Sequence, residues 1–267
     1  MTNFLSKEEK KISSEFKSKG YIIRKIKDIR YLKKIRKFFV KSIKKNLNIK
    51  DKIKSDKSLL NNIHQNIRTK DLNSFRLKII NDINKNKDFR ELYYKISKPL
   101  LEIILGNELA MQLRVNLSIQ LPDDDSSLLP IHSDVWSGDS PFESVVWLPL
   151  VDCYKTKSMF ILPPSKYFKI KKIFNQKNAS ASDQIFKKIK KDLRWIKIKY
   201  GEVLIFNQCL PHGNVVNLEN ETRWTLNCRF KSVFSPYSDK KIGEFFEPIT
   251  LRSVSELAIN YDLPKIS

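Results

Sequence analysis

The sequence predicts a mainly β core of the sandwich or jelly-roll class, with α-helices before it and inserted in it. Apolar residues recur at helical spacing from Lys7 to about Leu105, and the period changes to strict alternation at Met111. Several short apolar strands then follow, separated by loops. Because these strands do not alternate regularly with helices, a parallel doubly wound sheet is disfavoured.

Residues 1–109 form the predicted helical part. Apolar side chains recur three and four positions apart among lysines, as at Ile29, Leu32, Ile35 and Phe39. We expect these helices to pack outside the β core. His64 lies in this part with no acidic residue at ligand spacing, and we interpret it as a surface or packing residue.

Residues 110–232 are expected to form the β core. Alternation from Met111 to Leu121 predicts one strand with an apolar face and a polar face. Further strands are expected at 144–151, 159–164, 202–206 and 222–230, with turn-rich loops at 122–130 and 137–141. Residues 166–194 are lysine-rich with helical spacing and predict a helical insert. With a C-terminal extension over 233–267, we interpret residues 1–267 as one domain.

The formal net charge of +22 would attract polyanions. Lysine, isoleucine and asparagine are abundant while glycine is scarce, as AT-rich codons would give, so a solvated lysine surface explains the charge equally well. We do not expect nucleic acid as the partner, and peripheral contact with an anionic membrane stays open. Three cysteines without CxxC spacing indicate neither a disulfide framework nor a zinc site. Without a signal-like or membrane-spanning segment, a cytoplasmic protein is expected.

Two of the three histidines stand in short motifs, IHSD (131–134) and PHGN (211–214). His132 and Asp134 are two residues apart, so on an extended segment their side chains point to the same side and can share one ion. His212 follows the strand at 202–206. Two imidazoles and one carboxylate that leave metal positions open are the ligand set of non-haem Fe(II) oxygenases.

The strand at 222–230 has a polar face with two cations. Alternation places Arg223, Thr225, Asn227 and Arg229 on this face. An arginine fork in a partly desolvated cavity suits a carboxylate, because bidentate geometry adds direction to charge. The far carboxylate of 2-oxoglutarate is the anion that this arrangement would hold.

The motifs IHSD, WLPLVD, ILPPSKY, GEVLIF and PHGN, with Arg223 eleven positions after His212, resemble the phytanoyl-CoA dioxygenase-like branch of Fe(II)/2-oxoglutarate oxygenases. Within it, the likeness is to bacterial members that occur with carbohydrate biosynthesis clusters. The resemblance covers residues 110–232, and GYIIRKI (20–26) also fits. LPPSKY departs from the usual Pro-Gly-Ser-His stretch, which leaves the geometry of that turn open.

The resemblance implies a double-stranded β-helix (jelly roll) in which His132, Asp134 and His212 bind Fe(II). Arg223 would pair with the C5 carboxylate of 2-oxoglutarate, the cosubstrate that is consumed with O2. Trp147 would line the cosubstrate pocket.

Asn214 would supply a small polar contact in the same pocket, although a turn residue is the plain alternative for it, as a core residue is for Trp147. Asn116 and Gln120, on the polar face of the first predicted strand, are further candidates for holding the cosubstrate. Asp123 to Asp125, Trp136 and Asp139 border the metal motif and would contact either a polyhydroxylated substrate or solvent.

The expected function is a dioxygenase that hydroxylates a small molecule, such as a sugar or an anionic, nucleotide-linked sugar, in carbohydrate biosynthesis. One alternative is an AlkB-type nucleic-acid demethylase, favoured by the R-x5-R spacing of Arg223 and Arg229. The early position of this pair and the order of Thr225 and Asn227 argue against it. The other alternative is a non-catalytic, cupin-like sugar-binding module, which would have no need for Arg223.

Overall fold

The computed structural model describes residues 4–49, 55–174 and 182–263. Within these ranges ten strands form two sheets. The strands are β1 Tyr21–Lys25, β2 Leu109–Gln112, β3 Asn116–Gln120, β4 Glu143–Pro149, β5 Phe160–Ile161, β6 Arg194–Trp195, β7 Glu202–Asn207, β8 His212–Gly213, β9 Arg223–Ser232 and β10 Phe246–Thr250. The helices are α1 Lys7–Lys19, α2 Ile29–Asn46, α3 Asp56–Asn61, α4 Leu72–Asn84, α5 Lys87–Ile104, α6 Tyr167–Phe174, α7 Ser182–Ile189 and α8 Ser253–Ile259.

The larger sheet is antiparallel, in the order β1-β7-β4-β9-β2-β10, and β3 also pairs with β9. Strand β9 is long enough to take two partners on one edge: Asn116–Gln120 along its first half and Leu109–Met111 along its second. The smaller sheet has the order β6-β5-β8 and brings His212 opposite Ile161. Two sheets with the metal motifs at the edge of the smaller one agree with the predicted jelly roll.

The single strand predicted from Met111 to Leu121 is wrong, because it is broken into β2 and β3. At the break, Asn84 of α4 holds the backbone of Val115: its side-chain amide donates to the Val115 carbonyl at 3.1 Å, and its Oδ1 accepts from the Val115 amide at 3.1 Å. A neighbouring side chain thus replaces ladder partners at that point. Beyond the break, the predicted faces hold, since Leu117 and Ile119 are buried and Asn116 is exposed.

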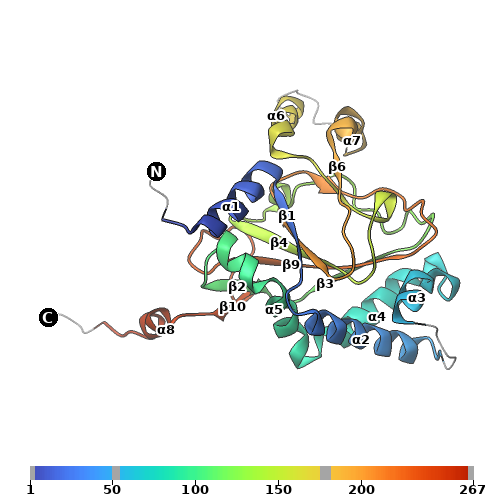
Figure 1. Ribbon diagram of the computed structural model, residues 1–267, viewed down its shortest axis with the longest axis horizontal. Coiled ribbons are helices and arrows are strands. Elements are labelled where there is room, and N and C mark those ends of the chain that lie inside the picture. The colour runs from blue at the N-terminus through green and yellow to red at the C-terminus, as the bar shows by residue number, and fades with distance from the viewer. Residues whose placement is uncertain (1–3, 50–54, 175–181, 264–267) are drawn as a thin grey trace.

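The helices lie outside the β sheets as expected, but they share one hydrophobic core with the larger sheet. Helices α2, α4 and α5 pack on each other and against the larger sheet, and their apolar faces form one cluster with Trp224, Leu226, Cys228 and Phe230 of β9. The indole N–H of Trp224 donates to the Leu60 carbonyl at 2.8 Å. Figure 1 shows α2 to α5 gathered along one side of the sheet. One face of the sheet is therefore a helix-covered core, and the other is free to form a cavity.

Strand β1 was not predicted as a strand by the residue pattern. Its sequence, YIIRK, lies between lysine-rich helices, yet it pairs with β7 from Tyr21–Phe206 to Lys25–Glu202. Gly20 ends α1 in a left-handed conformation, φ 79°. A Cβ there would also meet the Leu210 side chain at 2.1 Å. This glycine therefore lets the chain turn tightly from helix into strand.

The inserted helices and the C-terminal extension lie away from the helix-covered face. Helices α6 and α7 agree with the predicted insert, although part of the small, polar stretch between them lies outside the described residues. They lie at the opposite end of the molecule from α2 to α4 (Figure 1). The extension adds β10 to the edge of the larger sheet and ends in α8. Among the described residues, no helix has the length and apolar character needed to span a membrane.

Candidate metal centre and cosubstrate cavity

The two motif histidines, His132 and His212, are joined by a reciprocal pair of backbone hydrogen bonds. The His132 amide donates to the His212 carbonyl at 2.9 Å, and the His212 amide donates to the His132 carbonyl at 2.8 Å. Gly213 permits this approach, since a Cβ there would lie 2.6 Å from the Leu129 carbonyl oxygen. The ring centroids of the histidines are 4.4 Å apart. Two motifs 80 residues apart in the sequence are thus joined by main-chain bonds.

Both imidazoles are oriented by carbonyl groups. His132 Nδ1 lies 2.7 Å from the Pro130 carbonyl oxygen, and His212 Nδ1 lies 2.8 Å from that of Leu210. Because a carbonyl oxygen only accepts, each Nδ1 donates its proton and each Nε2 keeps a free lone pair. The Nε2 atoms lie 3.6 and 3.9 Å from Asp134 Oδ1. One ligand atom of each residue lies within 4.8 Å of the others, so the three fit a single ion.

Asp134 is held by both its backbone and its second oxygen. It begins a 3₁₀ turn, Asp134–Ser137, and its amide donates to the Gln208 carbonyl at 3.2 Å. Arg229 of β9 lies 3.1 Å from Asp134 Oδ2 and also donates to Gln208 Oε1 at 3.1 Å. Asp139 lies 3.4 Å from the Arg229 Nε. The carboxylate therefore has one oxygen fixed by an arginine and the other directed at the histidines.

The protonation states of these side chains favour binding of a cation. Burial lowers the pKa of His212 to about 4, so that imidazole is neutral at pH 7. Burial alone would lower the pKa of His132, but the Asp134 carboxylate and the Pro130 carbonyl favour its protonated form, and the net effect is a raised pKa. For Asp134, burial opposes ionisation, yet His132, His212 and Arg229 hold its pKa well below the usual range. An ionised carboxylate beside a neutral imidazole suits metal binding.

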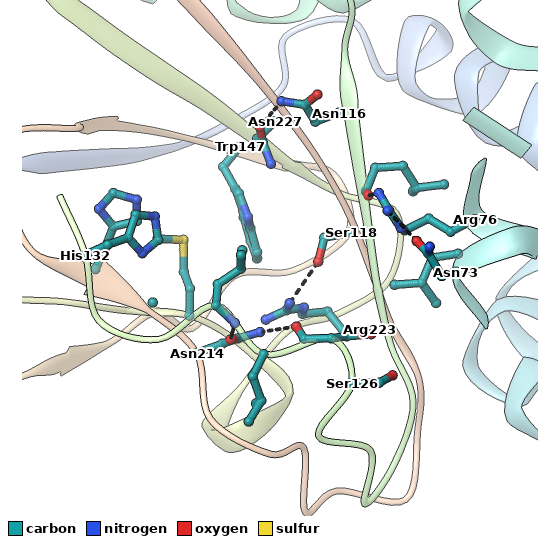
Figure 2. A pocket seen from close by; sticks show the side chains of 18 of the residues that line it. Asn73, Arg76, Asn116, Ser118, Ser126, His132, Trp147, Asn214, Arg223 and Asn227 are labelled. Atoms are coloured by element: carbon teal, nitrogen blue, oxygen red, sulfur yellow. Dashed lines mark hydrogen bonds between the residues drawn. The ribbon is translucent and has the colours of Figure 1, made fainter. Parts of the chain in front are cut away.

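The three ligands line a cavity of about 660 Å³, which is within the range that holds small-molecule ligands. Arg223 lies in the same cavity and is 3% exposed. It donates to the Ser158 carbonyl at 3.2 Å and to Ser118 Oγ at 3.0 Å, while its Nε has no hydrogen-bond partner among the described residues. Burial lowers the pKa of Arg223 to about 10. Figure 2 shows Arg223 and Ser118 between His132 and Arg76.

The other predicted cosubstrate residues also reach the cavity. Trp147 on β4 is 5% exposed, lines the cavity and packs with Met159 and Phe206, so it is both core and wall. Asn214 lines it too, but its Oδ1 accepts from the Leu129 amide at 2.6 Å and so fixes the loop before IHSD. Asn116 lines the cavity and donates to Asn227 Oδ1 at 3.0 Å.

The remaining sequence candidates lie elsewhere. Gln120 is fully buried and donates to the Val215 carbonyl, outside the residues that line the cavity. Asp124 is buried in a turn, where it accepts from the Ser126 amide at 2.9 Å and the Ser127 hydroxyl. Asp139 binds Lys240 at 2.5 Å and contacts Arg229, so it supports the metal cluster from behind. His64 is half-buried and contacts Thr222 Oγ1 at 3.0 Å, which confirms the packing role.

Sequence reasoning missed two groups of residues. Arg229 was placed on the correct face of β9, but its contact with Asp134 depends on a turn 95 positions earlier. The far wall of the cavity is formed by Thr69, Lys70, Asn73 and Arg76, from the start of α4 and the 3₁₀ turn before it. No motif marks these residues, and the expectation that the helices lie outside the core pointed away from them.

No family model matches the sequence, and no curated protein matches it. The structure, in contrast, is similar to solved non-haem oxygenases. The α-ketoglutarate-dependent carbocyclase SnoK from nogalamycin biosynthesis has a TM-score of 0.56 at 13% identity, covering 92% of this chain and 97% of that one. The nickel complex of the monooxygenase ThoJ gives 0.54 at 12% identity, covering 91% and 85%.

A further similar structure is EctD from S. alaskensis with 2-oxoglutarate and 5-hydroxyectoine, with a TM-score of 0.54 at 14% identity over 89% of this chain and 80% of that one. At such identities the likeness establishes the fold. The chain therefore has the double-stranded β-helix fold of these oxygenases, and the predicted fold class is confirmed.

Proposed function

We propose that the protein is an Fe(II)- and 2-oxoglutarate-dependent dioxygenase that oxidises a small molecule. The observation that carries this proposal is the joint presence, in one cavity, of a two-histidine, one-carboxylate cluster and a buried arginine without a carboxylate partner among the described residues. Leaving a buried cation unpaired is costly, and a bound dicarboxylate would remove that cost. The motifs support placing the chain in the phytanoyl-CoA dioxygenase-like branch.

The donor set fits ferrous iron, since three protein ligands leave coordination positions open for cosubstrate and O2. When bound, Fe(II) would supply O2 activation coupled to decarboxylation of 2-oxoglutarate to succinate and CO2. His132, Asp134 and His212 would hold the ion, and Arg223 would pair with the C5 carboxylate through its free donors.

Other residues of the cavity would position the reactants. Ser118 and the Ser158 carbonyl would keep the Arg223 guanidinium in place. Trp147, Met159 and Phe206 would exclude water from the cosubstrate. Arg229 would hold Asp134 in one orientation.

We propose a polyhydroxylated substrate, such as a sugar or an anionic, nucleotide-linked sugar, that is hydroxylated during carbohydrate biosynthesis. The support comes from neutral hydrogen-bonding groups that line the same cavity, which are the side chains of Asn116, Ser126, Ser127 and Asn227. Similar structures include an epimerase and a carbocyclase, so the same fold also carries outcomes other than hydroxylation.

The test is an anaerobic titration of the metal-free protein with Fe(II) and then 2-oxoglutarate, following the visible metal-to-ligand charge-transfer band. We expect a band that His212→Ala abolishes and that needs much more 2-oxoglutarate in Arg223→Ala. Arg114→Ala is the matched control, because Arg114 is exposed and lies outside the cavity lining. No band in the wild-type protein with confirmed metal content would instead favour the non-catalytic, cupin-like binding module.

A further inference from the structure

The cavity continues past the cosubstrate region to a second compartment. Strand β3 pairs with β9 along one edge, and within the described residues no strand covers its other edge. The cavity passes this open edge and reaches Thr69, Lys70, Asn73 and Arg76, which we call the outer lobe. Figure 2 shows Asn73 and Arg76 on the side of the cavity opposite His132. One continuous cavity thus joins the metal cluster to the start of α4.

The charges lining this cavity are unequal. Its arginines and lysines are Lys70, Arg76, Arg223 and Arg229, whereas its only acidic lining residue in the described part of the chain is Asp134. Arg229 pairs with Asp134, and 2-oxoglutarate would pair with Arg223. Lys70 and Arg76 are left as two cations without an acidic partner in this lining.

Arg76 is held in place by neutral groups. One terminal nitrogen donates to Asn73 Oδ1 at 2.7 Å, and the other lies 3.4 Å from the Leu117 carbonyl oxygen. These contacts fix the plane of a half-buried guanidinium without cancelling its charge. Lys70, in the 3₁₀ turn before α4, is exposed and lines the same cavity. An oriented arginine fork and a lysine that line one part of a cavity are well suited to a phosphate group.

We infer that the outer lobe binds a phosphate group of the substrate, so that the enzyme acts on a phosphorylated small molecule. This inference rests on the proposed function for the identity of the reaction, but not for the binding of phosphate. Because the lobe and the metal cluster lie on opposite sides of the cavity, the oxidised carbon is separated from the phosphate by the length of the substrate. The outer lobe therefore determines which carbon of the substrate lies next to the metal cluster.

The experiment titrates metal-free full-length protein with inorganic phosphate and, separately, inorganic pyrophosphate, using ³¹P NMR at fixed, near-physiological ionic strength. Lys70→Gln/Arg76→Gln is compared with Lys78→Gln/Arg114→Gln. Lys78 is on the same helix, and both control residues are exposed and outside the cavity lining, so both variants lose the same charge. We expect at least about tenfold weaker binding in the outer-lobe variant, because hydrogen bonds to a charged group are lost, and little change in the control.

Two further measurements keep the result interpretable. Thermal melting shows whether each variant is folded, and Arg76→Lys keeps the charge without the fork, so it should bind with intermediate strength. Preference for pyrophosphate would support a nucleotide-diphosphate substrate, and preference for phosphate a phosphate monoester.

No phosphate binding by the wild-type protein, or equal weakening in both double variants, would overturn the inference. The charge-transfer titration is independent of this outcome. If the wild-type protein shows no charge-transfer band but its phosphate binding depends on the outer lobe, the proposed reaction is wrong and the phosphate site is still supported.

Discussion

The two ends of the cavity differ in how their charges are matched. At the metal end, Asp134 faces two histidines and Arg229, and Arg229 in turn contacts Asp139. At the other end, within the described residues, the Arg76 guanidinium donates hydrogen bonds only to neutral oxygen atoms, those of Asn73 and Leu117. A buried charge that already has partners can fix the geometry of a site, whereas a fixed cation without them has its charge available for a ligand. The difference separates the residues that build the site from those that select what enters it.

The largest effect is expected from Asp134→Asn. It removes a metal ligand and leaves Arg229 without its closest carboxylate. Substitution of a residue that only supports a metal ligand lowers metal affinity by up to roughly 100-fold, so Fe(II) affinity and succinate formation should fall by more than this. Asp125→Asn is the control, since Asp125 is exposed in the preceding loop. Phosphate binding in the outer lobe should persist; its loss would show that the two ends are not separate.

A smaller effect is expected from Arg229→Gln. The substitution frees Asp134 Oδ2 and should lower Fe(II) affinity by about 10- to 100-fold, as for other groups that orient metal ligands. Equilibrium dialysis with Fe(II) under anaerobic conditions measures it. Lys240→Gln, which changes Asp139 at the back of the same network, should have a weaker effect. If Arg229→Gln binds iron like the wild-type protein, the paired charges of this end do not position the ligand.

Ser118→Ala should affect the cosubstrate and leave iron binding unchanged. Ser118 Oγ accepts from Arg223, and loss of one such hydrogen bond should weaken 2-oxoglutarate binding by about fivefold. Ser126→Ala is the matched control, because Ser126 lines the same cavity but does not accept a hydrogen bond from Arg223. Titration of the charge-transfer band with 2-oxoglutarate gives the apparent Kd. Equal affinities for the two variants would show that Ser118 does not hold Arg223 in the position that binds the cosubstrate.

The smallest net effect is expected in the pH dependence of stability of the metal-free protein, because the two histidines oppose each other. The pKa of His212 falls from 6.5 to about 4 on folding, so the unfolded chain binds more protons between these values and stability falls as pH falls. The pKa of His132 rises on folding, so its contribution is present below pH 6.5 and is lost as pH rises through the folded value.

Urea unfolding between pH 4.5 and 7.5 tests this opposition. His212→Asn should reduce the loss of stability in acid, and His132→Asn should reduce the loss on the alkaline side of pH 6.5. Slopes that change in the same direction for both variants would show that the two imidazoles do not have opposite environments.

The faces of β9 and the metal cluster could be predicted from the sequence because both depend on short-range patterns. Alternation identified the buried and polar faces of β9. His132 and Asp134 lie on a short extended segment that ends in a 3₁₀ turn at Asp134, so their two-residue spacing brings both side chains to one site. Strand β1 was missed because a five-residue strand between helices has too little pattern of its own and is defined by pairing with β7. The break before β3 was missed because it depends on Asn84, 31 positions away. The outer lobe follows only from how α4 packs against the sheet.

The position of α4 has a consequence for how such a protein can change over time. Its first turns form a wall of the cavity, yet the helix contributes no metal ligand and no contact to Arg223. Under the proposed function, substitutions at its exposed cavity-facing positions would therefore alter which compounds are accepted and leave the metal cluster and Arg223 unchanged. A directed-evolution library confined to residues 69–76 would search for accepted compounds without changing any residue proposed to bind iron or 2-oxoglutarate.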